Sequence, residues 1–167
     1  MESETDSPWD HRLLRGGDGS RDEIARLVAV ASPRRQRVGW ATVELDRAER
    51  ELVAAAATPT ARVSELAGDA VLGATCRLLD LGNGRELVLL EPSTEGPLAA
   101  ALARHGEGPV ALYLEVDTGT AERVRLAGFA LARPGPGPFG SQRQVDLGRR
   151  DGPFVLLAPM SADAGHR

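Results

Sequence analysis

Cysteine is almost absent from this 167-residue sequence, because Cys76 is the only one. A single thiol excludes an internal disulfide and offers no cluster of thiolates for a metal ion. A chain without disulfides is typical of a reducing compartment. We therefore predict a cytoplasmic protein.

Lysine is absent altogether, so arginine supplies the positive side-chain charge, and the formal net charge is -4. A chain with an excess of acidic residues has no bulk electrostatic attraction to nucleic acid or to an anionic membrane surface. We expect neither of them as a partner.

Long apolar runs are missing as well. The run IARLVAVASP (24–33) is short and follows acidic residues, which argues against a secretion signal. No stretch approaches the roughly 18 consecutive apolar residues that a membrane-spanning helix needs. With 42% hydrophobic residues, the sequence instead predicts one domain with a packed core.

The first 36 residues show little periodicity. Residues 1–20 mix acidic residues, Ser and Gly, and residues 22–31 form at most a short helix before SPRRQR. We predict a flexible extension over 1–36, a folded domain over 37–160 and a tail over 161–167.

Strand and helix patterns alternate from residue 37 onward. A strand with period-two alternation leads into a helix that Asp46 and Glu49 open as a capping pair. Asn83-Gly84 then joins two further strands, because this dipeptide suits the positive φ angles of a tight hairpin turn. The expected elements of this first module, 37–93, are a strand at 37–46, a helix at 47–57, a short strand near 63–68, and strands at 71–82 and 85–92.

The second half of the chain repeats this order. ALYLEVD (111–117) reads nearly like WATVELD (40–46), and a helix pattern follows both. Repetition of this kind is typical of a duplicated architecture. After a linking segment, 94–108, the second module, 109–160, is expected to contain strands at 110–117, 129–134, 141–148 and 153–159 and a helix at 120–128.

The paired βαβββ modules resemble the vicinal oxygen chelate superfamily, which includes glyoxalase I, extradiol dioxygenases, methylmalonyl-CoA epimerase and antibiotic-binding resistance proteins. LVLLEP (87–92) closes the first module and ARHGEGPVALYLEVD (103–117) opens the second, and the resemblance covers residues 37–158. The pattern is most similar to methylmalonyl-CoA epimerase-like members. It implies an α+β fold in which the two modules form a half-open, glyoxalase-like barrel around a cup.

In catalytic members, as the resemblance implies, four inward side chains hold one divalent metal ion. Two come from the opening strands of the modules and two from the closing strands, and they are usually His, Gln and Glu. In this sequence the four positions fall on Trp40, Ala111, Val88 and Leu156. None of these residues binds a metal ion. We therefore predict no metal ion and no other cofactor.

The candidate catalytic residues share a face with the replaced ligand positions. Period-two alternation puts Glu44 on one face of the first strand, and Glu115 and Tyr113 on the matching face of the fifth. A carboxylate in an apolar cup has a raised pKa and exchanges a proton near neutrality. Tyr113 donates a phenolic proton or a hydrogen bond. The alternatives are that the glutamates lie in solvent or cap the backbone, and that Tyr113 is a packed residue.

Other side chains are candidates for ligand binding. A tryptophan at the cup offers a flat face for stacking, or it is a simple core residue. An arginine attracts a carboxylate, phosphate or phenolate, or it is a surface charge on an edge strand. The residues that we predict to bind ligand are Trp40, Thr42, Arg77, Glu86, Gln142, Gln144 and Asp146. The segment RPGPGPFG (133–140) is either a lid over the cup, as the resemblance implies, or a long hairpin connection.

Three functions stay open. The first is a metal-independent enzyme of the isomerase, lyase or cyclase type, which acts by proton transfer, isomerisation or cyclisation on an oxygen-rich small molecule. The second is a non-catalytic protein that binds an antibiotic-like or polyketide-like molecule. The third is a degenerate domain that acts through protein contacts, for which a filled cup would be the sign. A small molecule is the expected partner in the first two, and a homodimer is a further expectation.

Overall fold

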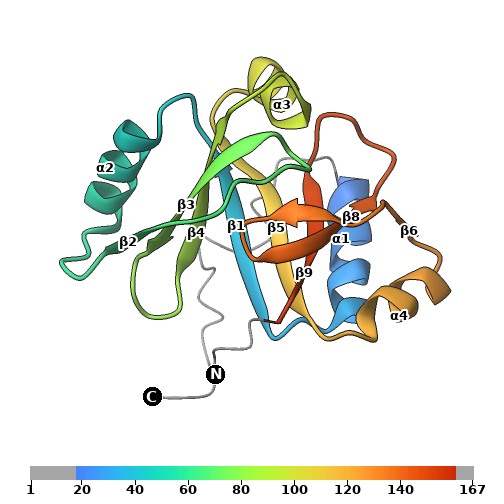
Figure 1. The fold of residues 1–167 in the computed structure, drawn as a ribbon. Coiled ribbons are helices and arrows are strands. Elements are labelled where there is room, and N and C mark those ends of the chain that lie inside the picture. The colour runs from blue at the N-terminus through green and yellow to red at the C-terminus, as the bar shows by residue number, and fades with distance from the viewer. Residues whose placement is uncertain (1–17, 161–167) are drawn as a thin grey trace.

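The computed structural model describes residues 18–160, in which four helices and nine strands form (Figure 1). The helices are α1 (Asp18–Ala31), α2 (Leu45–Ala56), α3 (Pro97–His105) and α4 (Thr120–Leu126). The strands are β1 (Arg35–Ala41), β2 (Arg62–Glu65), β3 (Ala74–Asp80), β4 (Glu86–Pro92), β5 (Gly108–Val116), β6 (Ala130–Leu131), β7 (Gly135–Gly137), β8 (Gly140–Asp146) and β9 (Phe154–Pro159).

The strands form one open mixed sheet in the order β2-β3-β4-β1-β5-β9-β8-β6, and β7 pairs with β8 outside this path. The opening strands β1 and β5 run antiparallel at the centre. Each has the closing strand of its own module as a parallel neighbour, β4 beside β1 and β9 beside β5. The order from the centre outward is therefore equivalent in the two halves, which confirms the predicted α+β fold of two modules.

The turn between β3 and β4 forms as the sequence predicts. Asn83 and Gly84 have φ angles of 55° and 75°, values that the asparagine-glycine pair tolerates. The N–H of Leu81 donates to the carbonyl of Arg85 at 2.9 Å and closes the turn. This hairpin holds β3 and β4 in register, so that Cys76 lies opposite Leu90.

Helices α1, α2 and α4 cover one face of the sheet (Figure 1). From α1, the side chains of Ile24, Leu27 and Ala31 are buried in this core. Their spacing of three and four residues is that of one helix face. This corrects the predicted start of the organised structure near residue 37, since α1 already belongs to the core. The remainder of the predicted extension, 1–17, and the tail, 161–167, lie outside the described residues.

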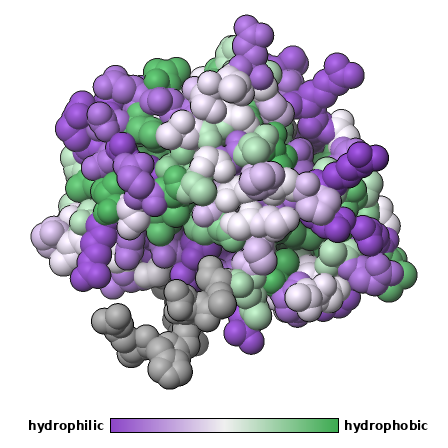
Figure 2. Space-filling view, in the orientation of Figure 1, coloured by the Kyte–Doolittle hydropathy of each residue, from purple (hydrophilic) through white to green (hydrophobic). Residues whose placement is uncertain are grey.

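The opposite side of the sheet, which we call the cup face, carries Gly39, Val88, Ala111, Tyr113 and Leu156. Its side chains form a second buried cluster. The cluster is closed from above by residues of α3, of the loop between β2 and β3, and of the β7–β8 turn, namely Leu98, Ala101, Leu66, Val71, Leu72 and Phe139. The interior of the cup is therefore filled with apolar side chains. In the space-filling view, the β7–β8 region appears as a closed, weakly polar surface (Figure 2).

The described helices have no membrane-spanning character. None of those within residues 18–160 combines the length and the apolarity needed to cross a membrane.

Candidate functional site

The first strand turns a different face toward the cup than the sequence pattern predicts. Trp40 packs against the core on the helix side of the sheet, while Gly39 faces the cup. A Cβ atom at Gly39 would lie 2.8 Å from the Cβ of Ala111 and 3.2 Å from the ring of Tyr113, so β1 approaches β5 this closely only with glycine. The prediction that Trp40 lines the cup is therefore wrong, because Arg37 and Gly39 occupy the cup face of β1.

Thr42 lies just beyond the end of β1 and anchors the connection to α2. Its hydroxyl donates to Oε1 of Glu107 at 2.7 Å, and the same oxygen accepts from the N–H of Val43 at 2.8 Å. Arg47 forms a salt bridge with this carboxylate. The Thr42 hydrogen bond, followed by those of Val43 and Arg47, lowers the pKa of Glu107 to about 2. Thr42 therefore holds a loop in place, and its predicted position in the cup is wrong.

Glu44 also lies in this connection, at the N-cap of α2. Its carboxylate is 3.9 Å from the guanidinium of Arg47 on the helix surface, and its side chain is largely exposed. Glu115, by contrast, is a buried residue within β5. The predicted pairing of these two glutamates across the internal repeat is therefore wrong, because it matches a loop residue with a strand residue.

The charged groups of the cup face meet at Arg37. Its Nε donates to Oε2 of Glu86 on β4 at 2.8 Å, and its Nη1 donates to Oε2 of Glu115 on β5 at 3.2 Å. The side chains of Arg37, Glu115 and Glu86 are 7%, 11% and 18% exposed. Charge-assisted hydrogen bonds to a planar guanidinium fix its orientation. Three strands, β1, β4 and β5, thus contribute one side chain each to a single ion-pair cluster. We call it the Arg37 triad; it consists of Arg37, Glu86 and Glu115.

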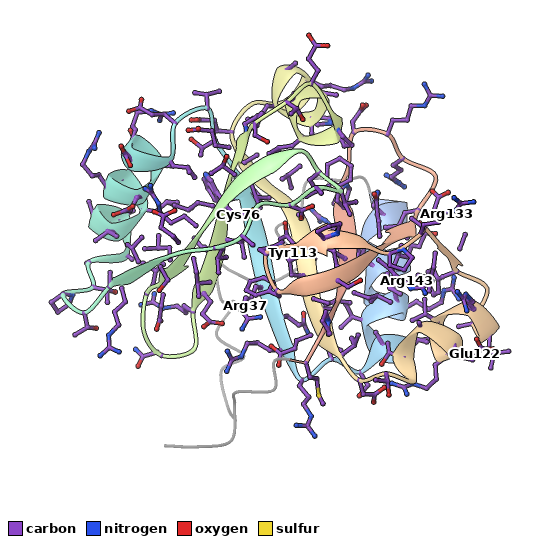
Figure 3. All side chains as sticks on the ribbon, in the orientation of Figure 1. Arg37, Cys76, Tyr113, Glu122, Arg133 and Arg143 are labelled. Carbon is purple, nitrogen blue, oxygen red and sulfur yellow. The ribbon has the colours of Figure 1, made fainter. Side chains whose placement is uncertain are left out.

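The turn between β7 and β8 covers this triad. Cζ of Arg37 lies 4.3 Å from the ring centroid of Phe139. The same ring meets Tyr113 edge to face, with centroids 5.6 Å apart and an interplanar angle of 77°. Both geometries are attractive. Figure 3 shows Arg37 and Tyr113 near the middle of the sheet, beside the β7–β8 hairpin.

Tyr113 lies deeper in the cup and joins it to the loop between β2 and β3. Its hydroxyl donates to Oδ2 of Asp69 at 2.7 Å. Oδ1 of Asp69 accepts from the N–H groups of Val71 and Leu72, each at 2.9 Å. Burial, with the nearby charge of Asp69, raises the pKa of Tyr113 well above its usual value. Tyr113 therefore keeps its proton and acts as a hydrogen-bond donor.

Of the three predicted residues on this face of β8, only Gln142 is fully buried. Gln142 is completely buried, and neither its Oε1 nor its Nε2 makes a hydrogen bond within the described residues. Gln144 is half-buried opposite Leu156. Asp146 is exposed and accepts from the N–H of Gly148 at 2.7 Å, outside the cup.

Arg77 faces the opposite side of β3 from the cup. Its guanidinium is 2.8 Å from the carboxylates of Asp46 and Glu49 on α2 and 2.8 Å from that of Glu65 on β2. These hydrogen bonds, with that of Asp46 the strongest, raise the pKa of Arg77. The predicted capping pair, Asp46 and Glu49, therefore binds an arginine of the sheet. The prediction that Arg77 faces the cup is wrong, because it clamps α2 and β2 to β3.

The structure thus brings four of the ten predicted site residues to the cup. They are Glu115, Tyr113, Glu86 and Gln142. Sequence reasoning missed Arg37 and Asp69. Arg37 shares its strand face with Gly39, two positions later, but only the structure shows that this face of β1 points into the cup. Asp69 had no readable signal in the sequence, because it lies in a loop whose path over the cup depends on tertiary packing.

The side chains of the cup do not fit the divalent metal ion that the resemblance implies. Val88, Ala111 and Leu156 carry no donor atom in their side chains. The two cup-face carboxylates of the triad already accept hydrogen bonds from a guanidinium, which occupies the position beside them. Within residues 18–160, no group of three or more His, Cys, Asp or Glu residues is placed to hold a metal ion.

Comparison with solved structures identifies the fold. A hypothetical protein from Bacillus halodurans matches with a TM-score of 0.65 and 18% identity, over 81% of this chain and 99% of that chain. Methylmalonyl-CoA epimerase from Mycobacterium tuberculosis matches with a TM-score of 0.64 and 20% identity, over 75% and 86%. A methylmalonyl-CoA epimerase in complex with methylmalonyl-CoA and NH4+ matches with a TM-score of 0.64 and 22% identity, over 78% and 96%. No protein-family model and no curated protein matches the sequence. The chain has the fold of the vicinal oxygen chelate superfamily.

Proposed function

We propose that the cup binds an oxygen-rich small molecule without a metal ion, and that the guanidinium of Arg37 donates a hydrogen bond to it. The observation that carries this proposal is the position of the guanidinium, which Glu86 and Glu115 hold from two neighbouring strands. Its Nη2 makes no hydrogen bond to any residue of 18–160 and is free to donate to a ligand oxygen. A fixed guanidinium recognises carbonyl and carboxylate oxygens.

The partners of the other polar groups favour binding without chemistry. The hydroxyl of Tyr113 already donates to Asp69, and Oε2 of Glu115 already accepts from Arg37. The polar side chain of the cup that lacks a partner is the amide of Gln142, which binds but does not transfer protons. On this proposal the protein sequesters its ligand unchanged. Because apolar side chains fill the cup in the structure, the ligand enters only when the Phe139 ring moves away from Arg37. If the ring stays in place, the third function, a domain that acts through protein contacts, applies instead.

One observation favours a metal-independent enzyme as the second candidate. Oε1 of Glu115 makes no hydrogen bond to any described residue, and it lies on the same strand face as Tyr113. In such an enzyme, Oε1 takes a proton from a carbon beside a carbonyl group. The C–H electron pair forms a carbon–carbon double bond, and the π pair of the carbonyl moves onto its oxygen. Nη2 of Arg37 stabilises the resulting enolate. Return of the proton to the same carbon or to a neighbouring one gives epimerisation or isomerisation.

Nuclear magnetic resonance tests the binding proposal. The labelled protein is titrated with 2-oxobutanoate, 2,3-butanedione and salicylate, with and without EDTA. We expect at least one probe to shift the amide signals of Gly39, Tyr113 and Glu115 equally in both conditions. Arg37→Lys should weaken this binding about tenfold or more, because it keeps the charge and loses the planar fork. The control Arg143→Lys, at a half-buried arginine pointing to the other face, should leave it unchanged.

Three results would contradict the proposal: no probe shifts these signals, EDTA abolishes binding, or Arg37→Lys binds as well as the natural protein. Deuterium exchange at carbon 3 of 2-oxobutanoate separates the two candidates. The binding protein leaves this exchange at its uncatalysed rate. The enzyme accelerates it, and Glu115→Gln removes the acceleration while the probe still binds.

A further inference from the structure

We infer that the side-chain amide of Gln142 forms hydrogen bonds with the ligand. The ligand then carries a hydrogen-bond donor beside an acceptor, as in a lactam, a carboxylic acid or an enolised β-dicarbonyl. This inference rests on the proposed function, because it concerns the same cup. It assigns the chemical class of the molecule, which the Arg37 triad alone does not define.

The first argument is the missing partners of the Gln142 amide. The residue is 0% exposed, and both of its polar side-chain atoms lack a hydrogen bond within the described residues. A buried amide without partners destabilises the folded state, whereas an apolar side chain of the same shape does not. A glutamine at this position is therefore unfavourable for the closed structure and is explained by a ligand that supplies both missing partners.

The second argument is the space made for the side chain. Gly135 lies opposite Gln142 in the β7–β8 pair. A Cβ atom at Gly137 would lie 2.1 Å from Cδ of Gln142, so the amide occupies the space that a side chain at Gly137 would need. Gln142 precedes the pair of Arg143 with Leu157 on β9 and shares the cup face with Gln144.

The third argument is the closeness of this amide to the Arg37 triad. Glu115 on β5 pairs with Ala158 on β9. Extending the β8–β9 register by one residue beyond the pair of Arg143 with Leu157 sets Gln142 opposite Ala158. On this register Gln142 and Glu115 lie on either side of β9 on the cup face, and a ligand that spans β9 reaches both Gln142 and the guanidinium that Glu115 binds.

Phe139 and the β7–β8 turn cover these groups, and the Phe139 ring meets Tyr113 edge to face. Phe139 stacks on Arg37, and the N–H of Ala70 donates to the carbonyl of Pro136 at 3.0 Å. The hairpin lies in front of the central strands in Figure 1. A ligand that displaces the ring of Phe139 replaces its contact with Arg37 and gains the amide of Gln142.

The chemical class follows from the geometry of an amide. A glutamine side chain presents an N–H donor and a C=O acceptor side by side. A lactam, a carboxylic acid or an enolised β-dicarbonyl presents the complementary pair and makes two hydrogen bonds. A plain ketone or ether satisfies only the donor and leaves Oε1 of Gln142 unpaired.

The test uses 2-pyridone, a lactam, and N-methyl-2-pyridone, which lacks the donor, as probes of the full-length protein. We expect 2-pyridone to shift the side-chain amide signals of Gln142, and the N-methyl compound to bind about tenfold or more weakly. Gln142→Met should lose 2-pyridone binding and raise the melting temperature by roughly 3–8 °C. The matched control Gln144→Met, on the same strand face but half-exposed, should change neither quantity.

The inference is overturned if 2-pyridone does not bind, if its N-methyl analogue binds equally well, or if Gln142→Met keeps the binding or lowers the melting temperature. In any of these cases, binding of 2-oxobutanoate, 2,3-butanedione or salicylate that depends on Arg37 leaves the proposed function standing. Loss of every Arg37-dependent interaction refutes the proposed function itself.

Discussion

Replacing Arg37 with methionine tests how much the buried triad contributes to stability. The substitution keeps most of the aliphatic bulk and removes the guanidinium that binds Glu86 and Glu115. Glu86 retains Arg35 at 3.6 Å, whereas Glu115 is left buried without any positive partner among the described residues. Breaking a buried ion pair by removing one partner costs about 3–5 kcal/mol. We expect a loss of about 3 kcal/mol, the lower part of this range, because only Glu115 loses its last positively charged partner.

Urea unfolding followed by circular dichroism measures this loss at pH 7. The double variant Arg37→Met/Glu115→Gln should recover a substantial part of it, because the uncompensated charge is gone. The control is Arg77→Met, which breaks three salt bridges instead of two. Its loss should be clearly smaller, since Asp46 and Glu65 are 70% and 71% exposed and such pairs contribute little. A loss below about 1 kcal/mol for Arg37→Met, or a larger loss for Arg77→Met, would refute the reasoning.

Two further predictions follow from shifted pKa values. Burial, with a smaller effect of Asp69, raises the pKa of the Cys76 thiol to about 12. A disulfide reagent at pH 8 should therefore modify Cys76 only as fast as the protein unfolds. Rapid modification of the folded protein would contradict this. The carboxylate of Glu107 has its pKa lowered from 4.5 to about 2, so its contribution to stability is present above pH 4.5 and is lost as the pH falls toward 2. The melting temperatures of the natural protein and of Glu107→Gln should therefore converge over this interval, and a constant difference would show that this carboxylate does not anchor Thr42.

The duplicated fold was predictable because its signals are local and repeated. Two strand-to-helix transitions, the Asn83-Gly84 turn and the closing apolar strands each follow from short-range patterns. Helix α1 was missed as part of the core, although Ile24, Leu27 and Ala31 have helical spacing. Their signal was obscured by the polar residues before them and by Pro33 after them.

The site was less predictable because it depends on which face of each strand points inward. On β5 the alternation assigns Glu115 and Tyr113 to the cup face, where the structure has them. On β1 the predicted inward positions were shifted by one residue, and a one-residue shift exchanges the two faces of a strand. It placed Trp40 in the cup and left Arg37 out. The length of the connection between β1 and α2 caused this error, since it cannot be read from alternation.

A cobalt soak tests the central claim, that the cup holds a guanidinium in place of a metal ion. A crystal of the full-length protein is grown without chelators and soaked in cobalt chloride, and anomalous scattering locates any bound cobalt. Our account predicts no anomalous peak in the cup and Arg37 in contact with both Glu86 and Glu115. A cobalt ion bound between β1, β4, β5 and β9, with Arg37 displaced from the two carboxylates, would contradict it.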